Sequence, residues 1–428
     1  MSSFETNGAA VVIDMVVNAA LTPPDREAFS LDPCLPGHPN PYLIYSALLQ
    51  ESPLQWCEGP GLWVVLGHPE SASLMRDSRC RRQDHLDKLI RRFGNDRIFG
   101  AQKMDIPFMD GEAHAGARHH VMAAFRSIDL QSLDQYCRQF VHERLDTIEP
   151  GSWFDFVDVM AYPLPICVAS ELIGVPQDLQ QQVLEQVGHF VRARGLTQNN
   201  ETASDGDEAM EVYRRTFLPL IQERRAKPGD DLLSRLLVDR DRQLSFSDEA
   251  LLLIVSSNFY SASTYTVPLL ISNSVERLAK QPDLLVQLRQ SPELIDVAIE
   301  EFLRIDPPAQ AINVGALSEP IELAGQTIQA GSSMTSMIGA ANRDPRVFRQ
   351  PDLFLLDRDP NPHLSFAPGL HQCLGLHLAR VQLRAVLQAL LQRCRSLEVD
   401  SQRSLRLQAD RFRGFDRLMV RFEATAGL

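Results

Sequence analysis

The sequence predicts a mainly α-helical protein with a minor β region, and three observations support this fold class. Apolar residues recur at three- and four-residue spacing through long stretches from residue 113 onward, which is the pattern of amphipathic helices. Segments that read as strands are short and confined to residues 62–66 and 321–338. The composition, 44% hydrophobic and 23% charged, is that of a globular protein with a large core.

The charge balance and the apolar runs exclude two classes of protein. The net charge is −13, with 42 basic and 55 acidic side chains, so a nucleic-acid partner is not expected. The apolar run near the N-terminus is interrupted by Asp14 and Asn18, and the longest run elsewhere, 250–255, is far too short to cross a bilayer. We therefore expect no membrane span and a cytoplasmic location. Residues 1–30 are expected to form an N-terminal extension and residues 31–428 a single domain.

Three helices are predicted in the middle of the chain, over residues 131–148, 154–175 and 178–194. The second of them is nearly continuously apolar, which indicates burial, and is expected to be interrupted at Pro163 and Pro165. The polar stretch 198–207 predicts a mobile loop.

A long helix is predicted to begin near Ser247, which is a good N-cap, and to continue for about thirty residues. Its first half is apolar on all sides, so it should cross the interior of the protein. A further helix over 292–305 ends at two prolines, and short strands follow at 321–323, 327–329 and 332–338. The last strong helix is expected over 374–394.

Cys373 lies in the segment FAPGLHQCLG (366–375), a glycine-containing loop directly before that last helix. The helix dipole and the free N–H groups at such a position are expected to lower the pKa of a thiol. A single thiolate of this kind can ligate a haem iron. The alternative is a buried structural cysteine at a helix start, and the local pattern leaves both open.

The segment resembles the haem-binding signature of the cytochrome P450 monooxygenases, Phe-Gly-x-Gly-x-His-x-Cys-x-Gly. The matching residues are Phe366, Gly369, His371, Cys373 and Gly375, with Ala367 in place of the first glycine. The resemblance implies haem b as cofactor, with Cys373 as the iron ligand and His371 as a donor to a haem propionate. It also implies the cytochrome P450 fold, a triangular single domain with a long central helix over the haem.

Two further segments resemble the same family. Glu301 and Arg304 match its Glu-x-x-Arg motif, for which the implied role is a buried, structural ion pair rather than a solvated surface pair. His114 and Arg118 match a His-x-x-x-Arg helix whose side chains bind the propionates, the alternative being two surface cations. Many relatives carry another propionate-binding arginine after the second proline segment. Residues 310–315 hold no cation, so we expect fewer charged contacts to haem here.

The same resemblance places the long helix over the oxygen side of the haem, with Thr266 as the catalytic hydroxyl. Tyr265 stands where relatives have a carboxylate, and no Asp or Glu occurs from 250 to 275. A phenol with a pKa of about 10 relays protons poorly at neutral pH. We expect Thr266 to contact the oxygen site and Tyr265 to pack outward and hydrogen-bond a neighbouring element. A water chain could replace the acid, or the reaction could be an unusual oxidation such as ring coupling, desaturation or rearrangement.

The resemblance implies a monooxygenase that uses dioxygen and two NAD(P)H-derived electrons from a separate ferredoxin or flavodoxin. Such a partner is expected to dock near Cys373, where Arg380 and Arg384 lie. The substrate is expected to be a small apolar specialised metabolite or a carrier-protein-bound intermediate, contacted by residues 81–103, 191–210 and 314–317. The alternatives are a peroxide-driven enzyme and a non-catalytic haem protein.

Overall fold

We analysed a computed structural model of the chain, which describes residues 41–58, 61–94, 98–196, 198–237, 246–409 and 411–425. The N-terminal extension expected over residues 1–30 lies outside the described residues. Helices make up 59% of the structure and strands a small part, which confirms the predicted fold class.

The α-helices are α3 (Pro41–Glu51), α4 (His68–Leu74), α5 (Arg82–Phe93), α6 (Ile98–Ala101), α7 (Gly111–Phe125), α8 (Leu130–Asp146), α9 (Pro163–Ile173), α10 (Gln177–Ala193), α11 (Asn200–Ala226), α12 (Leu232–Leu237), α13 (Asp248–Leu253), α14 (Ala262–Lys280), α15 (Pro282–Gln290), α16 (Ile295–Ile305), α17 (Ile338–Ala341) and α18 (Leu376–Arg393). The strands are β1 (Leu54–Cys57), β2 (Leu62–Val65), β3 (Cys80–Arg81), β4 (Phe154–Asp155), β5 (Ala311–Leu317), β6 (Ile321–Leu323), β7 (Gln326–Ile328), β8 (Ser333–Met337), β9 (Cys394–Val399), β10 (Leu405–Arg406), β11 (Phe415–Arg417) and β12 (Met419–Ala424).

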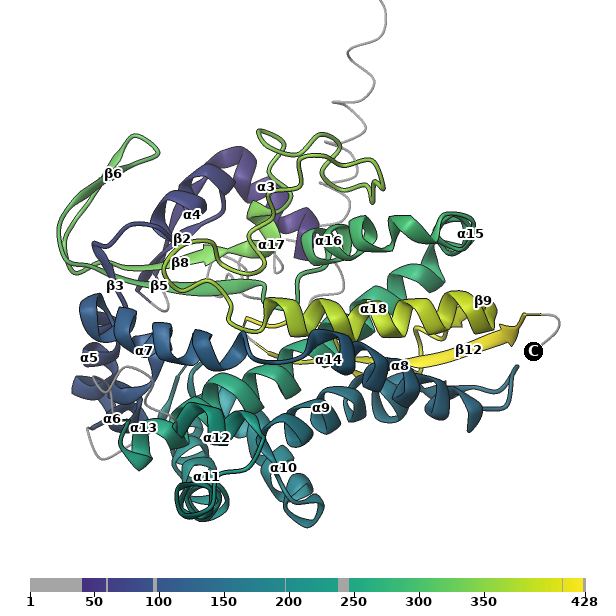
Figure 1. The fold of residues 1–428 in the computed structure, drawn as a ribbon. Coiled ribbons are helices and arrows are strands. Elements are labelled where there is room, and N and C mark those ends of the chain that lie inside the picture. The colour runs from purple at the N-terminus through teal and green to yellow at the C-terminus, as the bar shows by residue number, and fades with distance from the viewer. Residues whose placement is uncertain are drawn as a thin grey trace, which may run out of the picture.

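The predicted long helix is present, and it runs through the middle of the molecule between α9 and α18 (Figure 1). It begins where expected, since the Ser247 hydroxyl accepts a hydrogen bond from the Ala250 amide at 3.2 Å. Residues Ile254–Ser261 (η4) are wound as a π-helix between α13 and α14. Wider turns of this kind interrupt α-helices mainly at functional sites.

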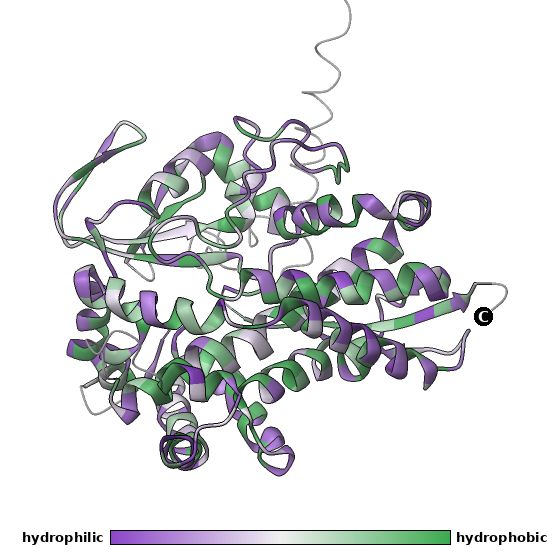
Figure 2. Cartoon of the chain, viewed as in Figure 1, coloured by the Kyte–Doolittle hydropathy of each residue, from purple (hydrophilic) through white to green (hydrophobic). Residues whose placement is uncertain are grey.

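Five strands form the main sheet in the order β1-β2-β8-β5-β3, and only the β2–β8 pair is parallel. A second sheet has the order β4-β12-β9, and β6–β7 and β10–β11 form two small hairpin-like pairs. The largest core cluster surrounds α14, and two smaller ones lie against the main sheet. Hydrophobic residues accordingly concentrate on the central helices, whereas outlying turns of α10 and α15 are hydrophilic (Figure 2).

Two sequence-based predictions are wrong. Residues 198–207 were expected to form a loop, but α11 begins at Asn200 because Asn199 and Thr202 cap it reciprocally, each accepting a backbone hydrogen bond from the other, at 2.9 and 3.0 Å. The interruption predicted at Pro165 is also absent, because Pro165 lies within the first turn of α9. The interruption at Pro163 is confirmed: a short strand and a π-helical turn over Val157–Ala161 come first, and Pro163 then starts α9, at a position where proline's missing N–H costs nothing.

Within the ranges given above, no single helix is both long and apolar enough to span a membrane. The segments Val157–Ile173 and Gln177–Ala193 pass that test only together, as a pair bent by 120°.

Candidate active site

Cys373 and the central helix face each other across a cavity of about 380 Å³. Cys373, Phe366 and Leu378 line one side of the cavity, and Ala262 and Thr266 of α14 line the other. The two sides are about a hundred positions apart in the sequence, and the packing of α14 against α18 brings them together. The thiol and the hydroxyl singled out in the sequence therefore open onto the same space.

The loop that carries Cys373 has a tightly defined backbone. The Cys373 amide donates to the Phe366 carbonyl at 2.9 Å. Gly369 has φ +111°, and a Cβ at this position would collide with the Met75 carbonyl, so glycine is required. Ala367 adopts φ +49° where the signature has its first glycine. The loop thus keeps the left-handed turn despite the substitution, at a cost of roughly 1–2 kcal/mol.

The expected lowering of the Cys373 pKa is wrong. Burial raises the pKa of this thiol, and the hydrogen bond from the Gly375 amide and the nearby Arg118 and Arg380 only partly offset that effect. Cys373 is exposed towards the cavity that it lines, but the protein encloses it on its other sides. A bound metal ion is the stronger means of deprotonating such a thiol.

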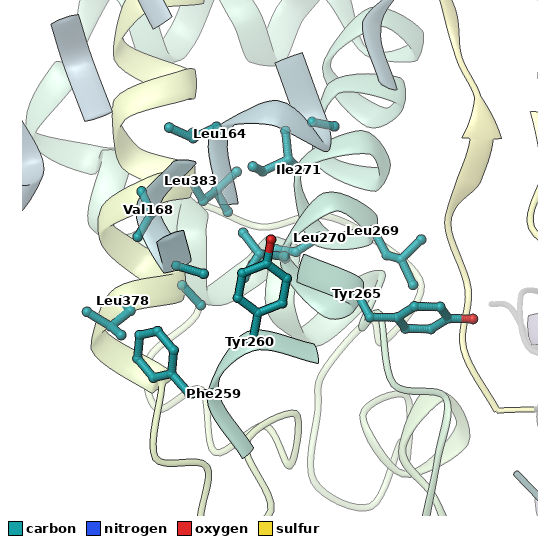
Figure 3. Close-up of a cluster of buried hydrophobic side chains, with 14 of the residues drawn as sticks. Leu164, Val168, Phe259, Tyr260, Tyr265, Leu269, Leu270, Ile271, Leu378 and Leu383 are labelled. Carbon is teal, nitrogen blue, oxygen red and sulfur yellow. The ribbon is translucent and has the colours of Figure 1, made fainter. Parts of the chain in front are cut away.

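The two conspicuous side chains of α14 differ in their surroundings. The Thr266 hydroxyl donates to the Ala262 carbonyl at 2.8 Å and lies at the cavity surface. Tyr265 also lines the cavity, but its ring is buried and stacks edge-to-face on Phe412 at 5.0 Å, on the side away from Phe259 and Tyr260 (Figure 3). Among the described residues it has no hydrogen-bond partner, contrary to expectation, and burial raises its pKa above the usual 10.

Arg118 and His371 line one edge of the cavity, and His114 packs behind them against His371. The two imidazole rings lie with centroids 4.1 Å apart, and Arg118 Nη2 donates to the Gln372 carbonyl at 2.5 Å. Burial, reinforced by the charge of Arg82, lowers the pKa of His371 to about 2, and burial also lowers the pKa of His114. Both rings are therefore neutral at pH 7. The buried Nε2 of His114 has no partner among the described residues, so this edge offers an unsatisfied ring nitrogen.

Glu301 and Arg304 form a fully buried bidentate ion pair, with both N–O distances 2.7 Å. Arg358 also donates to both oxygens of Glu301 at 3.0 Å, and the Leu355 amide donates to one of them at 3.0 Å. The guanidinium of Arg304 donates in addition to the carbonyls of Asn342, Pro351 and Leu353. The pair therefore ties α16 to the irregular segment that leads to the cysteine loop.

The cytochrome P450 family model matches residues 64–415 of the chain. The chain belongs to the cytochrome P450 family. It is 32% identical to the biotin biosynthesis cytochrome P450 of Bacillus subtilis over 391 residues, which is 90% of this chain and 96% of that protein. It is 34% identical to the mycinamicin IV hydroxylase/epoxidase of Micromonospora griseorubida, covering 78% of this chain and 82% of that protein.

Among solved structures, the fold matches P450BioI in complex with an acyl carrier protein that bears hexadec-9Z-enoic acid. The TM-score is 0.80 at 30% identity, covering 90% of this chain and 99% of that one. The protein is thus a cytochrome P450 monooxygenase, an oxidoreductase whose relatives act in specialised metabolism, and the family implies a haem iron bound by a thiolate. The alternative left open by the sequence, a non-catalytic haem protein, is not supported, because the relatives are named as monooxygenases and hydroxylases.

The residues present fit a haem. When bound, the haem supplies the iron that activates dioxygen. Cys373 would hold the iron from one side, and the unpartnered Nε2 of His114, with His371 and Arg118, would bind the propionates. Thr266 would hold a proton or a water on the opposite side. No carboxylate is among the described residues that line this cavity, so the missing acid of α14 has no direct replacement there.

Several cavity residues were not singled out in the sequence. Arg194 lines the cavity and pairs with the buried Asp105 at 3.0 Å, while its Nη1 donates to the Ser257 hydroxyl at 2.6 Å. Arg411 and Phe412 enter from the C-terminal region, far from the three predicted substrate regions. Of those regions, 81–103 and 191–210 do contribute, but β5 contributes its residues 311–313 instead of 314–317. No pattern in the sequence around Arg411 and Phe412 predicts that these residues line a cavity.

The expected docking arginines are already paired. Arg380 binds Glu300 through two hydrogen bonds of 2.6 and 2.7 Å, and Arg384 Nη2 lies 2.6 Å from Asp296. Their charge is therefore largely neutralised by carboxylates of α16. Leu370, in the loop that carries Cys373, is an exposed apolar side chain, with 56% of its surface accessible.

Proposed function

We propose that this cytochrome P450 oxidises a biosynthetic intermediate with an apolar body and one polar group, using dioxygen and two NAD(P)H-derived electrons delivered by a ferredoxin or flavodoxin. The observation that carries the proposal is that Cys373 and Thr266 line one cavity. The cysteine holds the cofactor and the hydroxyl serves proton delivery on the opposite side. The cytoplasmic location expected from the sequence stays a prediction.

The cavity walls support a substrate that is mainly apolar. The apolar side chains around the cavity include Phe125, Phe190, Val191, Phe259, Val267 and Phe412. Polar side chains, among them four arginines (Arg82, Arg118, Arg194 and Arg411), lie between these apolar groups, and such a mixture can orient an apolar substrate through specific polar contacts. This part of the proposal agrees with the apolar substrate expected from the sequence.

The contact to the polar group of the substrate is assigned to a second, smaller cavity of about 150 Å³. It shares Arg82, Arg194 and Phe412 with the main cavity. Both amide atoms of Gln102, which is completely buried, lack partners in the described part of the chain. Because unpaired buried amides are costly, this wall favours a substrate with a carbonyl, amide or carboxylate at one end. A carrier-bound acyl chain has this chemistry, as does the ligand in the P450BioI complex.

A peroxide-driven or otherwise unusual oxidation is a second candidate, and the absence of a carboxylate from the described cavity lining favours it. Without an acid near Thr266, dioxygen-dependent turnover depends on water to deliver protons. A peroxide supplies the oxygen already reduced, together with its protons, so it relaxes this requirement.

One experiment separates the two candidates and tests the substrate class. The holoenzyme is titrated with a homologous set of acyl compounds, as hydrocarbon, free acid, amide and carrier-protein thioester, and binding is followed by the shift of the haem absorption band. The tightest binder is then supplied with reduced ferredoxin and dioxygen, or with hydrogen peroxide alone. We expect polar-ended chains to bind better than the hydrocarbon and ferredoxin to support turnover. Turnover with peroxide only would favour the second candidate, and equal binding of the hydrocarbon would refute the polar contact.

A further inference from the structure

We propose that Arg82 supplies the propionate-binding cation that many relatives carry in the segment corresponding to residues 310–315, which here holds no cation. The proposal rests on the haem-binding role of the cavity. It assigns Arg82 to the binding of the carboxylate edge of the haem.

The strand pairing places Arg82 beside this segment, of which residues 311–315 belong to β5. Strand β3 pairs with β5, with Arg81 opposite Ala316. The strands approach so closely that a Cβ on Gly315, which has φ +119°, would lie 2.7 Å from the Arg81 carbonyl carbon. Arg82, the residue after Arg81, therefore begins its helix next to β5.

A shared carboxylate positions Arg82 relative to the other propionate-binding residues. Asp110 is the residue immediately before α7, the helix that carries His114 and Arg118. Its two oxygens accept hydrogen bonds from the backbone amides of Arg82 at 3.2 Å and Gln83 at 2.9 Å. The first turn of α5 is thus held directly at the start of α7. This links Arg82 to the same edge of the cavity as the two histidines.

The side chain of Arg82 is available for an anion. It lines both cavities, its Nε is buried without a partner, and no described residue forms an ion pair or hydrogen bond with its guanidinium. Burial lowers its pKa to about 10, so it remains protonated at neutral pH. A buried cation is ordinarily paired, and the carboxylate of Asp110 is engaged by backbone amides and by Arg81, 3.9 Å away.

The charges at this edge agree with the assignment. Two propionates bring two negative charges. Arg82 and Arg118 supply two positive charges, and both side chains line the same cavity as His371 and Cys373.

The test is the rate at which the ferric holoenzyme transfers haem to excess apomyoglobin. Loss of a hydrogen bond to a charged group should speed dissociation of haem from Arg82→Met by about ten-fold or more. Arg81→Met is the matched control, because Arg81 is adjacent, lines neither cavity and pairs with Asp84 and Asp110. We expect Arg81→Met to transfer haem at a rate within about two-fold of the parent's, because an exposed ion pair contributes little free energy.

Two further readouts distinguish this proposal from others. The reduction potential of Arg82→Met should fall, because a nearby cation favours the reduced haem. Its reduced carbon monoxide complex should keep the thiolate-type band, so loss of that band would be a failure of the cysteine assignment instead. Unchanged haem transfer together with weaker substrate binding would assign Arg82 to the substrate and overturn the proposal. If Arg82→Met folds poorly, Arg82→Gln is measured under the same criteria.

Discussion

Glu301→Gln should destabilise the protein by about 3–5 kcal/mol and strip it of haem, although Glu301 lies outside the cavity lining. The substitution keeps the shape of the side chain but removes its charge. Arg304 and Arg358, both buried, would then lose their only carboxylate partner among the described residues. The segment that these arginines hold leads into the cysteine loop, so loss of the ion pair should also loosen the haem site.

The matched control is Asp296→Asn on the same helix. Asp296 is 69% exposed and pairs with Arg384 at the surface, where an ion pair contributes about 0–1 kcal/mol. The measurement is the urea-unfolding free energy of both variants, with haem content determined in parallel. A Glu301→Gln protein with parent-like stability and full haem, but slower turnover, would show that Glu301 acts in the chemistry and not in the architecture.

Thr266→Ala should direct most electrons to hydrogen peroxide and lower the product formed per NAD(P)H consumed on the order of ten-fold. The hydroxyl lies at the cavity surface and hydrogen-bonds the Ala262 carbonyl, so it is held where it can pass a proton. Alanine removes this group without filling or opening much space. NAD(P)H oxidation, peroxide and product are measured together with the substrate found in the binding series.

Tyr265→Phe is the control for that result. The ring of Tyr265 packs on Phe412 and phenylalanine preserves this contact, while burial already makes the phenol a weaker acid than usual. We expect coupling to change by less than about two-fold, given that a phenol of such high pKa transfers protons poorly at pH 7. Equal uncoupling by Tyr265→Phe and Thr266→Ala would mean that the phenol is part of the proton path.

The parts of the site that were predictable depend on local patterns. Cys373, His371 and Gly369 are close in the sequence, and the order of glycines and the helix that follows constrain the loop. The i, i+3 spacing of Glu301 and Arg304 likewise places both on one helix face. The N-cap predicted at Ser247 is another short-range signal, and the structure confirms it, because the Ser247 hydroxyl accepts a hydrogen bond from the Ala250 amide.

The parts that were not predictable depend on distant segments meeting. Arg82 gains its significance only because β3 pairs with β5, and Arg194 only because Asp105 and Ser257 lie beside it. The raised pKa of Cys373 is a consequence of burial, which the helix-start position alone does not reveal. The stretch 198–207 was predicted to be a loop because most of its residues are polar. The prediction did not take account of the capping box that Asn199 and Thr202 form at the start of α11.

The central claim is that Cys373 holds a haem in the cavity that Thr266 faces. The absorption spectrum of the reduced carbon monoxide complex tests it most directly, with Cys394→Ala as a control because Cys394 is buried and lies outside the cavity. The parent protein and Cys394→Ala should both give the red-shifted Soret band of thiolate-ligated haem, and Cys373→Ala should not give it. A Cys373→Ala protein that keeps the red-shifted band would contradict the account.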